Sequence, residues 1–231
     1  MREPPLIQER FAHRPDSGCD AATRRPPNRR TLAAIVRMYL KARILPTMIA
    51  VGYMAKRVAT RPSWLKAAHV ADVFSVSGCM SPDFADYIRF WKHNGYWLFD
   101  SPETIRAVAL EHAIDLSGTS LFYYEVGDQE FDEKERRWTS FQAEPTFSTD
   151  IIVPSRMNLE GYDIVSFSAR TNPEHSPLSC NALAEEIDTN RHCLLDSFER
   201  AQQLLNDGAL NQAEPGPFRI FAVYSTPWPE S

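Results

Sequence analysis

The middle of the chain, from about residue 120 to residue 169, carries several β-rich segments that follow one another with no helix between them. A charged stretch at residues 132–136 and a turn at Leu159-Glu160-Gly161 join these segments over short distances. Strands joined by short turns pair antiparallel, whereas neighbouring parallel strands need a long crossover. This run therefore favours an antiparallel or mixed sheet and argues against regular βαβ alternation.

Helix start signals lie on both sides of this run of strands. A Ser-Pro pair opens predicted helices at Ser81, Ser101 and Ser176, with serine as the N-cap and proline at the first helical position. A fourth helix is predicted from Asp196, with Glu199 three residues later as an imperfect capping box. The predicted strands are residues 72–77, 96–99, 121–126, 137–144, 149–153, 162–169 and 218–225. We expect an α+β fold, with a mostly antiparallel or mixed sheet of about six to seven strands and about four helices packed on it.

The composition of the chain changes near Met54. Residues 1–53 contain nine Arg and one Lys against two Glu and two Asp, which gives a net charge of +6. We predict a basic leader over residues 1–53, disordered or foreign to the natural protein, a single acidic α+β domain over residues 54–226, and a Pro-rich tail over residues 227–231. Translation that begins at Met54 is one interpretation of the leader. A targeting peptide and a basic segment lying on a membrane surface are the others.

Net charge and hydropathy narrow the classes of function. The whole chain carries −5, so the residues after 53 carry −11 once the +6 of the leader is taken away. Such a domain repels nucleic acid and anionic membranes, and it suits a basic protein partner. No uninterrupted apolar run approaches the ~20 residues that a membrane span needs.

The cysteines indicate a reducing compartment. The chain has four of them, and none forms a C-x-x-C pair. Three lie after residue 53 at irregular spacing, which is not a disulfide framework. We therefore expect reduced thiols and a cytoplasmic location.

Cys180 is the candidate catalytic nucleophile. It lies in the first turns of the helix predicted from Ser176, where backbone amides favour a thiolate, and His175 or His192 could serve as its base. Core packing is the competing interpretation, because Cys180 shares an apolar stripe with Leu183 and Ile187, and free cysteine is often buried.

Metal and cofactor sites find little support in the sequence. A ligand set of His175, Cys180, His192 and Cys193 fits no common zinc spacing. The nine glycines are scattered and form no phosphate-binding loop. We expect neither a metal nor a cofactor.

A cluster of aromatic residues near two carboxylates is the candidate partner-binding surface. Exposed aromatic side chains beside acidic ones make good hot spots for a protein partner. The candidate residues are Trp91, Tyr96, Trp97, Asp100 and Glu103.

Several short strings together resemble a group of small uncharacterised bacterial proteins. They are Trp64-Leu65-Lys66, Ser75-Val76-Ser77-Gly78-Cys79, His93-Asn94-Gly95-Tyr96-Trp97, His175-Ser176-Pro177-Leu178-Ser179-Cys180-Asn181 and residues 214–224, EPGPFRIFAVY. The resemblance covers Met54 to about Ser225 and implies no established activity. Acidic single-domain bacterial proteins also look like immunity proteins that neutralise secreted toxins, a general analogy that rests on no motif.

Two functions follow as hypotheses. The first is a non-enzymatic protein-binding domain, of the immunity type, that covers a basic toxin-like partner. The alternative is a cysteine-dependent hydrolase or transferase that uses Cys180 with His175 or His192.

Overall fold

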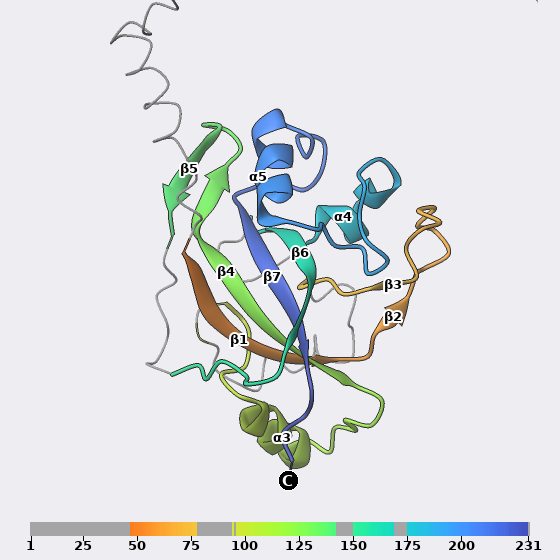
Figure 1. Cartoon of the computed structure of the whole chain (residues 1–231), viewed down its shortest axis with the longest axis vertical. Helices are drawn as coiled ribbons and strands as arrows, with labels where there is room; N and C mark the ends of the chain where they lie inside the picture. Colours follow the sequence, from red (N-terminus) through yellow and green to blue (C-terminus); the bar gives the residue numbers. More distant parts are fainter. Residues whose placement is uncertain (1–46, 78–93, 95, 142–149, 169–174, 231) are drawn as a thin grey trace, which may run out of the picture. The chain divides into compact units, whose positions relative to one another are not determined.

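The computed structural model describes residues 47–77, 94, 96–141, 150–168 and 175–230 (Figure 1). All of them lie in one of the two compact units of the chain, Pro46–Ser231. The helix predicted from Ser81 lies outside the described residues.

A five-stranded antiparallel sheet forms the centre of this unit. The strand order is β1-β4-β7-β6, and the short strand β5 pairs with the far end of β4 (Figure 1). A second sheet holds only β2 and β3. The strands are β1 Met48–Lys56, β2 Ala59–Thr60, β3 Asp72–Val73, β4 Ser120–Asp132, β5 Arg137–Ser140, β6 Asn158–Ser166 and β7 Phe218–Thr226.

Three α-helices and one 3-10 turn accompany the sheet in the described part of the chain. They are α3 Pro102–Glu111, α4 Pro177–Cys180, η3 Leu183–Glu185 and α5 Phe198–Asp207. The α+β class and the antiparallel sheet are thus confirmed. The predicted counts of strands and helices were somewhat off. One sheet of six to seven strands with about four helices was expected, whereas the described residues form a sheet of five strands, a second sheet of two, and three α-helices.

The two longer helices begin at serine caps. Ser101 accepts a hydrogen bond from the backbone N–H of Thr104, as its Ser-Pro signal predicts. The cap of α5 is Ser197, which accepts from the N–H of Arg200, and not the predicted Asp196. The helix α5 ends at Gly208, which adopts the left-handed conformation typical of a helix C-terminus.

The helix predicted from Ser176 is much shorter than its apolar stripe suggests. It ends after one turn at Cys180, because Ala182 adopts a left-handed conformation, with a φ of 59°. Leu183 and Ala184 then belong to the separate turn η3. The apolar stripe did not identify this break, and it located the buried side only in part: Ala184 and Ile187 are buried, whereas Cys180 and Leu183 are half-buried.

Several predicted strands are shortened, shifted or lost. The strand predicted over residues 137–144 ends at Ser140, and the one predicted over residues 162–169 is β6, Asn158–Ser166. Only Asp72 and Val73 of residues 72–77 are in a strand. Of residues 96–99, Phe99 alone makes an isolated bridge, to Tyr53. Residues 150–153 have no regular secondary structure.

The predicted domain boundary at residue 54 falls inside a strand. β1 begins at Met48, and Tyr53 pairs with Tyr123 of β4. Val51 and Tyr53 are both buried in the core. Residues 48–53, assigned to the leader from composition, therefore belong to the sheet in this structure.

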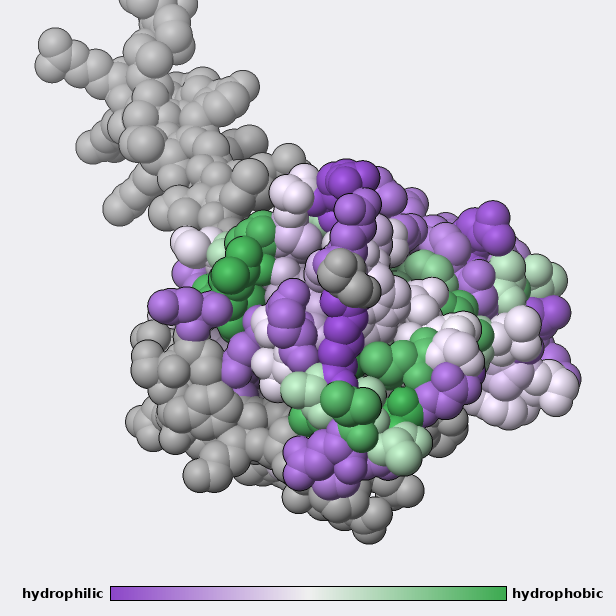
Figure 2. Space-filling view, turned by 90° about the horizontal axis from the view of Figure 1, so that it is seen from below, coloured by the Kyte–Doolittle hydropathy of each residue, from purple (hydrophilic) through white to green (hydrophobic). Residues whose placement is uncertain are grey.

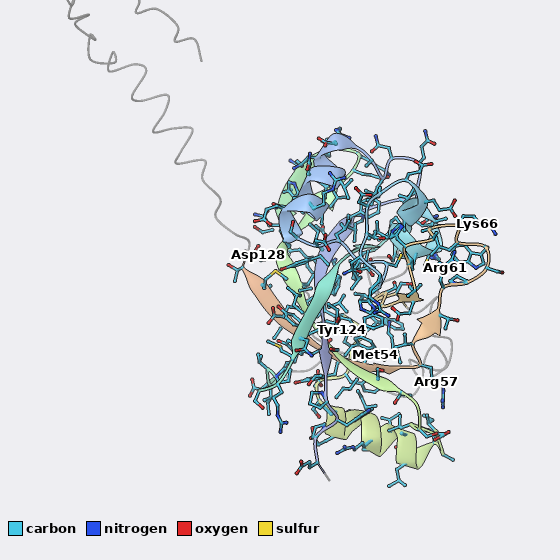
Figure 3. The ribbon with its side chains drawn as sticks, turned by 45° about the vertical axis from the view of Figure 1, so that its right-hand side comes forward. Met54, Arg57, Arg61, Lys66, Tyr124 and Asp128 are labelled. Carbon is cyan, nitrogen blue, oxygen red and sulfur yellow. The ribbon has the colours of Figure 1, made fainter. Side chains whose placement is uncertain are left out.

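The sheet is covered by apolar side chains on both faces. Along β7, Ile220 packs in one cluster with the buried face of α5, whereas Phe221 and Val223 pack in the other cluster. This alternation follows from the two-residue period of a strand. Figure 3 shows Tyr124 of β4 in the middle of the sheet, where its side chain is fully buried.

Candidate functional site

A cavity of about 410 Å³ lies beside the first turn of α3. Its wall combines that turn with residues 152–156 and with residues 226–230 at the C-terminal end. We call it the tail pocket. Most of the wall is apolar, formed by four prolines and by aromatic and aliphatic side chains such as Tyr53, Leu121 and Trp228. A small cavity with apolar walls and a few polar groups is the usual form of a binding site.

The C-terminal residues are held in place as part of this wall. Arg106 of α3 donates a hydrogen bond to the carbonyl oxygen of Pro229 at 2.5 Å, and its guanidinium lies 5.3 Å from the centre of the Trp228 ring. The indole N–H of Trp228 donates to the carbonyl oxygen of Thr119 at 3.4 Å. The predicted Pro-rich tail is therefore packed against the domain over residues 228–229.

Three charged residues line the tail pocket, namely Glu103, Arg156 and Glu230. All three are exposed at its rim. Burial, together with the nearby negative charge of Glu103, raises the pKa of Tyr53 to about 12. The hydroxyl of Tyr53 stays protonated and donates a hydrogen bond to the carbonyl oxygen of Ile152.

An exposed apolar strip continues from the pocket along the chain. Ile152 is 74% exposed, Val153 49%, Met157 36% and Leu159 48%. We call these four residues the 152–159 strip. They are four of the six large hydrophobic residues exposed in the described part of the chain, so exposed apolar surface is concentrated here. Figure 2 views the molecule from the α3 end of Figure 1 and shows green hydrophobic patches beside purple hydrophilic surface.

The predicted partner-binding residues are only partly brought together. Tyr96 is 6% exposed and packs edge-on against the ring of Phe141, so it belongs to the core. Trp97 and Asp100 are half-buried. Glu103 is exposed and lines the tail pocket. Trp91 lies outside the described residues.

The candidate nucleophile Cys180 is half-buried at the end of α4. Its Sγ lies 3.6 Å from the hydroxyl of Ser77 and 3.8 Å from that of Ser179. His175 is also half-buried, and its carbonyl oxygen accepts a hydrogen bond from the N–H of Ser166.

The second candidate base, His192, faces carboxylates. Its Nδ1 lies 2.5 Å from a carboxylate oxygen of Asp72, and its Nε2 lies 3.8 Å from one of Glu160. The imidazole also stacks on Phe74, with 4.1 Å between ring centres. Both ring nitrogens are thus directed toward carboxylates, an arrangement that ties β3 to β6.

A buried polar network around Asp163 was not identified from the sequence. Asp163 is fully buried in β6 and accepts hydrogen bonds from the hydroxyls of Ser75 and Ser176 and from the N–H of Val76. Burial raises its pKa to about 6, and these hydrogen bonds limit the rise. The only signal in the sequence was an aspartate directly before the apolar pair Ile164-Val165 of a predicted strand.

Lys56 contributes the opposite charge to this network. Its ammonium group is buried and donates to the carbonyl oxygens of Ser75, Val76 and Ser77. The ammonium also lies 5.9 Å from the centre of the Tyr124 ring. These bonds fix the segment that follows β3, so the network stabilises the fold and forms no open site.

Cys193 is the other cysteine in the described part of the chain, and it is buried. Burial raises the pKa of the Cys193 thiol to about 12, so it remains a protonated thiol. In the part of the chain that the structure describes, no three side chains of His, Cys, Asp or Glu are grouped to hold a metal ion. No helix among the described residues is both long and apolar enough to cross a membrane.

Comparisons with known proteins identified no relative of this chain. No family model matches the chain, and neither the search of curated proteins nor the search of solved structures returned a match. A function for the chain must therefore be argued from its own residues.

Proposed function

We propose that this chain is a non-enzymatic protein-binding domain of the immunity type, which covers a basic surface on a partner protein. The observation that carries the proposal is the 152–159 strip, which continues into the tail pocket. Exposed apolar side chains concentrated around a small cavity are typical of a protein–protein contact, where a few anchors supply most of the affinity.

The charge of the domain supports a basic partner. The chain has 25 Lys and Arg against 30 Asp and Glu, and residues 1–53 hold ten and four of these, so the later residues hold 15 and 26. An excess of 11 negative charges speeds the encounter with a positive surface and repels a negative one.

Three basic residues of the domain indicate a side that is less suited to a basic partner. Arg57, Arg61 and Lys66 lie on the side that carries β2 (Figure 3). The guanidinium of Arg57 forms an ion pair with Asp115 at 3.5 Å. Arg61 and Lys66 add further positive charge here, so this side is the less suitable one for a positive partner surface.

The cysteine-dependent alternative receives less support. A thiolate nucleophile needs a base beside it. His192, one of the two bases considered, is directed toward Asp72 and Glu160. A hydrolase or transferase that uses Cys180 with His175 remains a prediction that iodoacetamide labelling near neutral pH would test.

The experiment for the binding proposal begins with affinity purification of the full chain from its native host. The stoichiometric partner is then purified, and its dissociation constant is measured for the double variant Ile152→Gln/Leu159→Gln. We expect a basic partner and a loss of affinity of at least about tenfold, or roughly 1.4 kcal/mol. The matched control is Leu110→Gln, because Leu110 is 86% exposed but lies outside the strip.

Two results would count against the proposal. One is the recovery of no stoichiometric partner, or of an acidic one. The other is a basic partner whose affinity is unchanged in the strip variant, which would move the interface elsewhere on the domain.

A further inference from the structure

The tail pocket has the features needed to hold one particular kind of partner side chain, and this inference rests on the proposed binding function. Its volume of about 410 Å³ is at the small end of the range for ligand sites. It therefore suits one or two side chains better than a folded element. Its lining indicates which side chain fits.

Two carboxylates approach the pocket from different elements. Glu103 lies in the first turn of α3, and Glu230 lies at the C-terminal end of the chain. Among the described lining residues, Arg156 is the only cation, and it is exposed. These three lining residues sum to a net charge of −1. Arg106 lies beside the pocket without lining it, and its guanidinium already contacts the carbonyl oxygen of Pro229 and the Trp228 ring, so the two glutamates are the groups left to attract a cation at the rim.

The walls suit a cation that carries an apolar stem. Leu121 and Tyr53 line the pocket and are buried, whereas Val153 lines it and is half exposed. Lys and Arg side chains place their methylene stems along apolar surface and keep the charged group near water and carboxylates.

Arginine matches this lining better than lysine. Its planar guanidinium presents five donors that can reach two carboxylates at once, and it stacks on aromatic rings, whereas lysine offers a compact charge. The structure already contains this kind of contact next to the pocket, where Arg106 lies over the Trp228 ring.

We propose that the tail pocket receives an arginine side chain of the basic partner, with its guanidinium bound between Glu103 and Glu230 and its stem against the apolar wall. The arginine is then the anchor of the interface, and the 152–159 strip packs around it. Arginine is among the residues most enriched at such anchor points.

The test uses the full chain and a small probe in place of the partner. N-acetyl-L-arginine amide is titrated while the indole N–H resonance of Trp228 is followed by NMR, with Trp228→Phe used to assign that resonance. We expect a saturable shift with millimolar affinity. The isosteric neutral probe N-acetyl-L-citrulline amide should give no saturable shift, and N-acetyl-L-lysine amide should bind more weakly.

Variants then locate the bound cation. The double variant Glu103→Gln/Glu230→Gln should bind the arginine probe with an affinity at least tenfold lower, because both carboxylates are lost. Glu111→Gln/Glu186→Gln removes the same number of charges from exposed residues outside the pocket and should leave the affinity unchanged. Unchanged resonances elsewhere in the spectrum establish that the variants fold.

Any of three results overturns the inference: no saturable shift with arginine, equal binding of citrulline or lysine, or no effect of the pocket variant. These failures are separate from failure of the proposed function. If the strip variant loses a basic partner while the arginine probe does not bind, only the arginine anchor is wrong. If arginine binds in the pocket but no basic partner exists, the binding function is wrong.

Discussion

At the scale of single residues, the protein buries several charged groups and supplies each with partners. Asp163 has three hydrogen-bond donors, and Lys56 has three carbonyl acceptors. Arg219 pairs with Glu130 and lies between the rings of Phe141 and Phe167, and burial lowers its pKa to about 10. A buried charge without partners would lower the stability of the folded state by several kcal/mol. The hydrogen-bond partners of each buried charge are therefore needed for the fold.

The raised pKa of Asp163 predicts how stability changes with pH. The folded protein holds this proton up to a pKa of about 6, whereas the ordinary pKa of an aspartate side chain is 3.8. The folded state therefore binds more protons between these values, and the free energy of unfolding falls as pH rises from about 4 to about 6. The contribution is roughly 3 kcal/mol, at about 1.4 kcal/mol for each pKa unit.

Asp163→Asn should remove this contribution, because an amide does not titrate. Urea unfolding at a series of pH values between 4 and 7 measures the effect. The control Asp188→Asn changes an exposed aspartate and should keep the fall in stability seen in the parent protein. An Asp163→Asn protein with the same pH profile as the parent would show that Asp163 is already ionised at pH 4.

At the scale of elements, Gly161 lies where β6 departs from regular pairing. The register with β7 shifts between Leu159 and Gly161, which marks a β-bulge, and Gly161 has a φ of 146°. A Cβ atom there would lie 2.7 Å from the Cβ of Leu194 and 2.8 Å from the carbonyl oxygen of Leu195. A larger residue at this position would therefore strain the backbone and collide with Leu194 and Leu195.

We predict that Gly161→Ala destabilises the protein by about 1–3 kcal/mol, as measured by urea unfolding. Gly118→Ala is the control, since Gly118 also has a positive φ, of 70°, but its nearest neighbour is the flexible end of Arg57 at 3.5 Å. If the two variants lose equal stability, the close approach of Leu194 and Leu195 adds nothing to the destabilisation, and the positive φ alone explains it.

Gly161 also shows why sequence patterns located the elements but not all of their ends. A glycine after Leu159-Glu160 looks like a turn, and only the close packing of Leu194 reveals a bulge inside a strand. Ala182 is a similar case, because nothing in an alanine signals a left-handed residue. The caps of α3 and the alternation of β7 are local effects, and for these the sequence was a sufficient guide.

The candidate site was harder to predict, because it joins distant parts of the chain. The tail pocket combines β1, α3, residues 152–156 and the C-terminal end. Glu103 was expected to contact a partner, but Ile152 and Trp228 were not singled out. Tyr96 was expected at the surface, yet its aromatic ring packs in the core. Composition identifies aromatic residues without saying which face they occupy.

At the scale of the whole molecule, the first strand links the start of the described chain to the centre of the sheet. β1 pairs with β4 from Met48 to Lys56. Two of the residues before Met54, Val51 and Tyr53, are almost fully buried. Burial of a large apolar side chain stabilises a protein by about 1.5–3 kcal/mol, so their loss would be a large fraction of a typical total of 5–15 kcal/mol.

We therefore predict that a chain shortened to begin at Met54 is less stable than one shortened to begin at Pro46, by at least about 3 kcal/mol in urea unfolding. The chain that begins at Pro46 keeps all of β1 and is the reference for this comparison. Equal stability of the two shortened chains would contradict this role for residues 48–53. It would also favour Met54 as the point where the stable domain begins, the boundary indicated by composition alone.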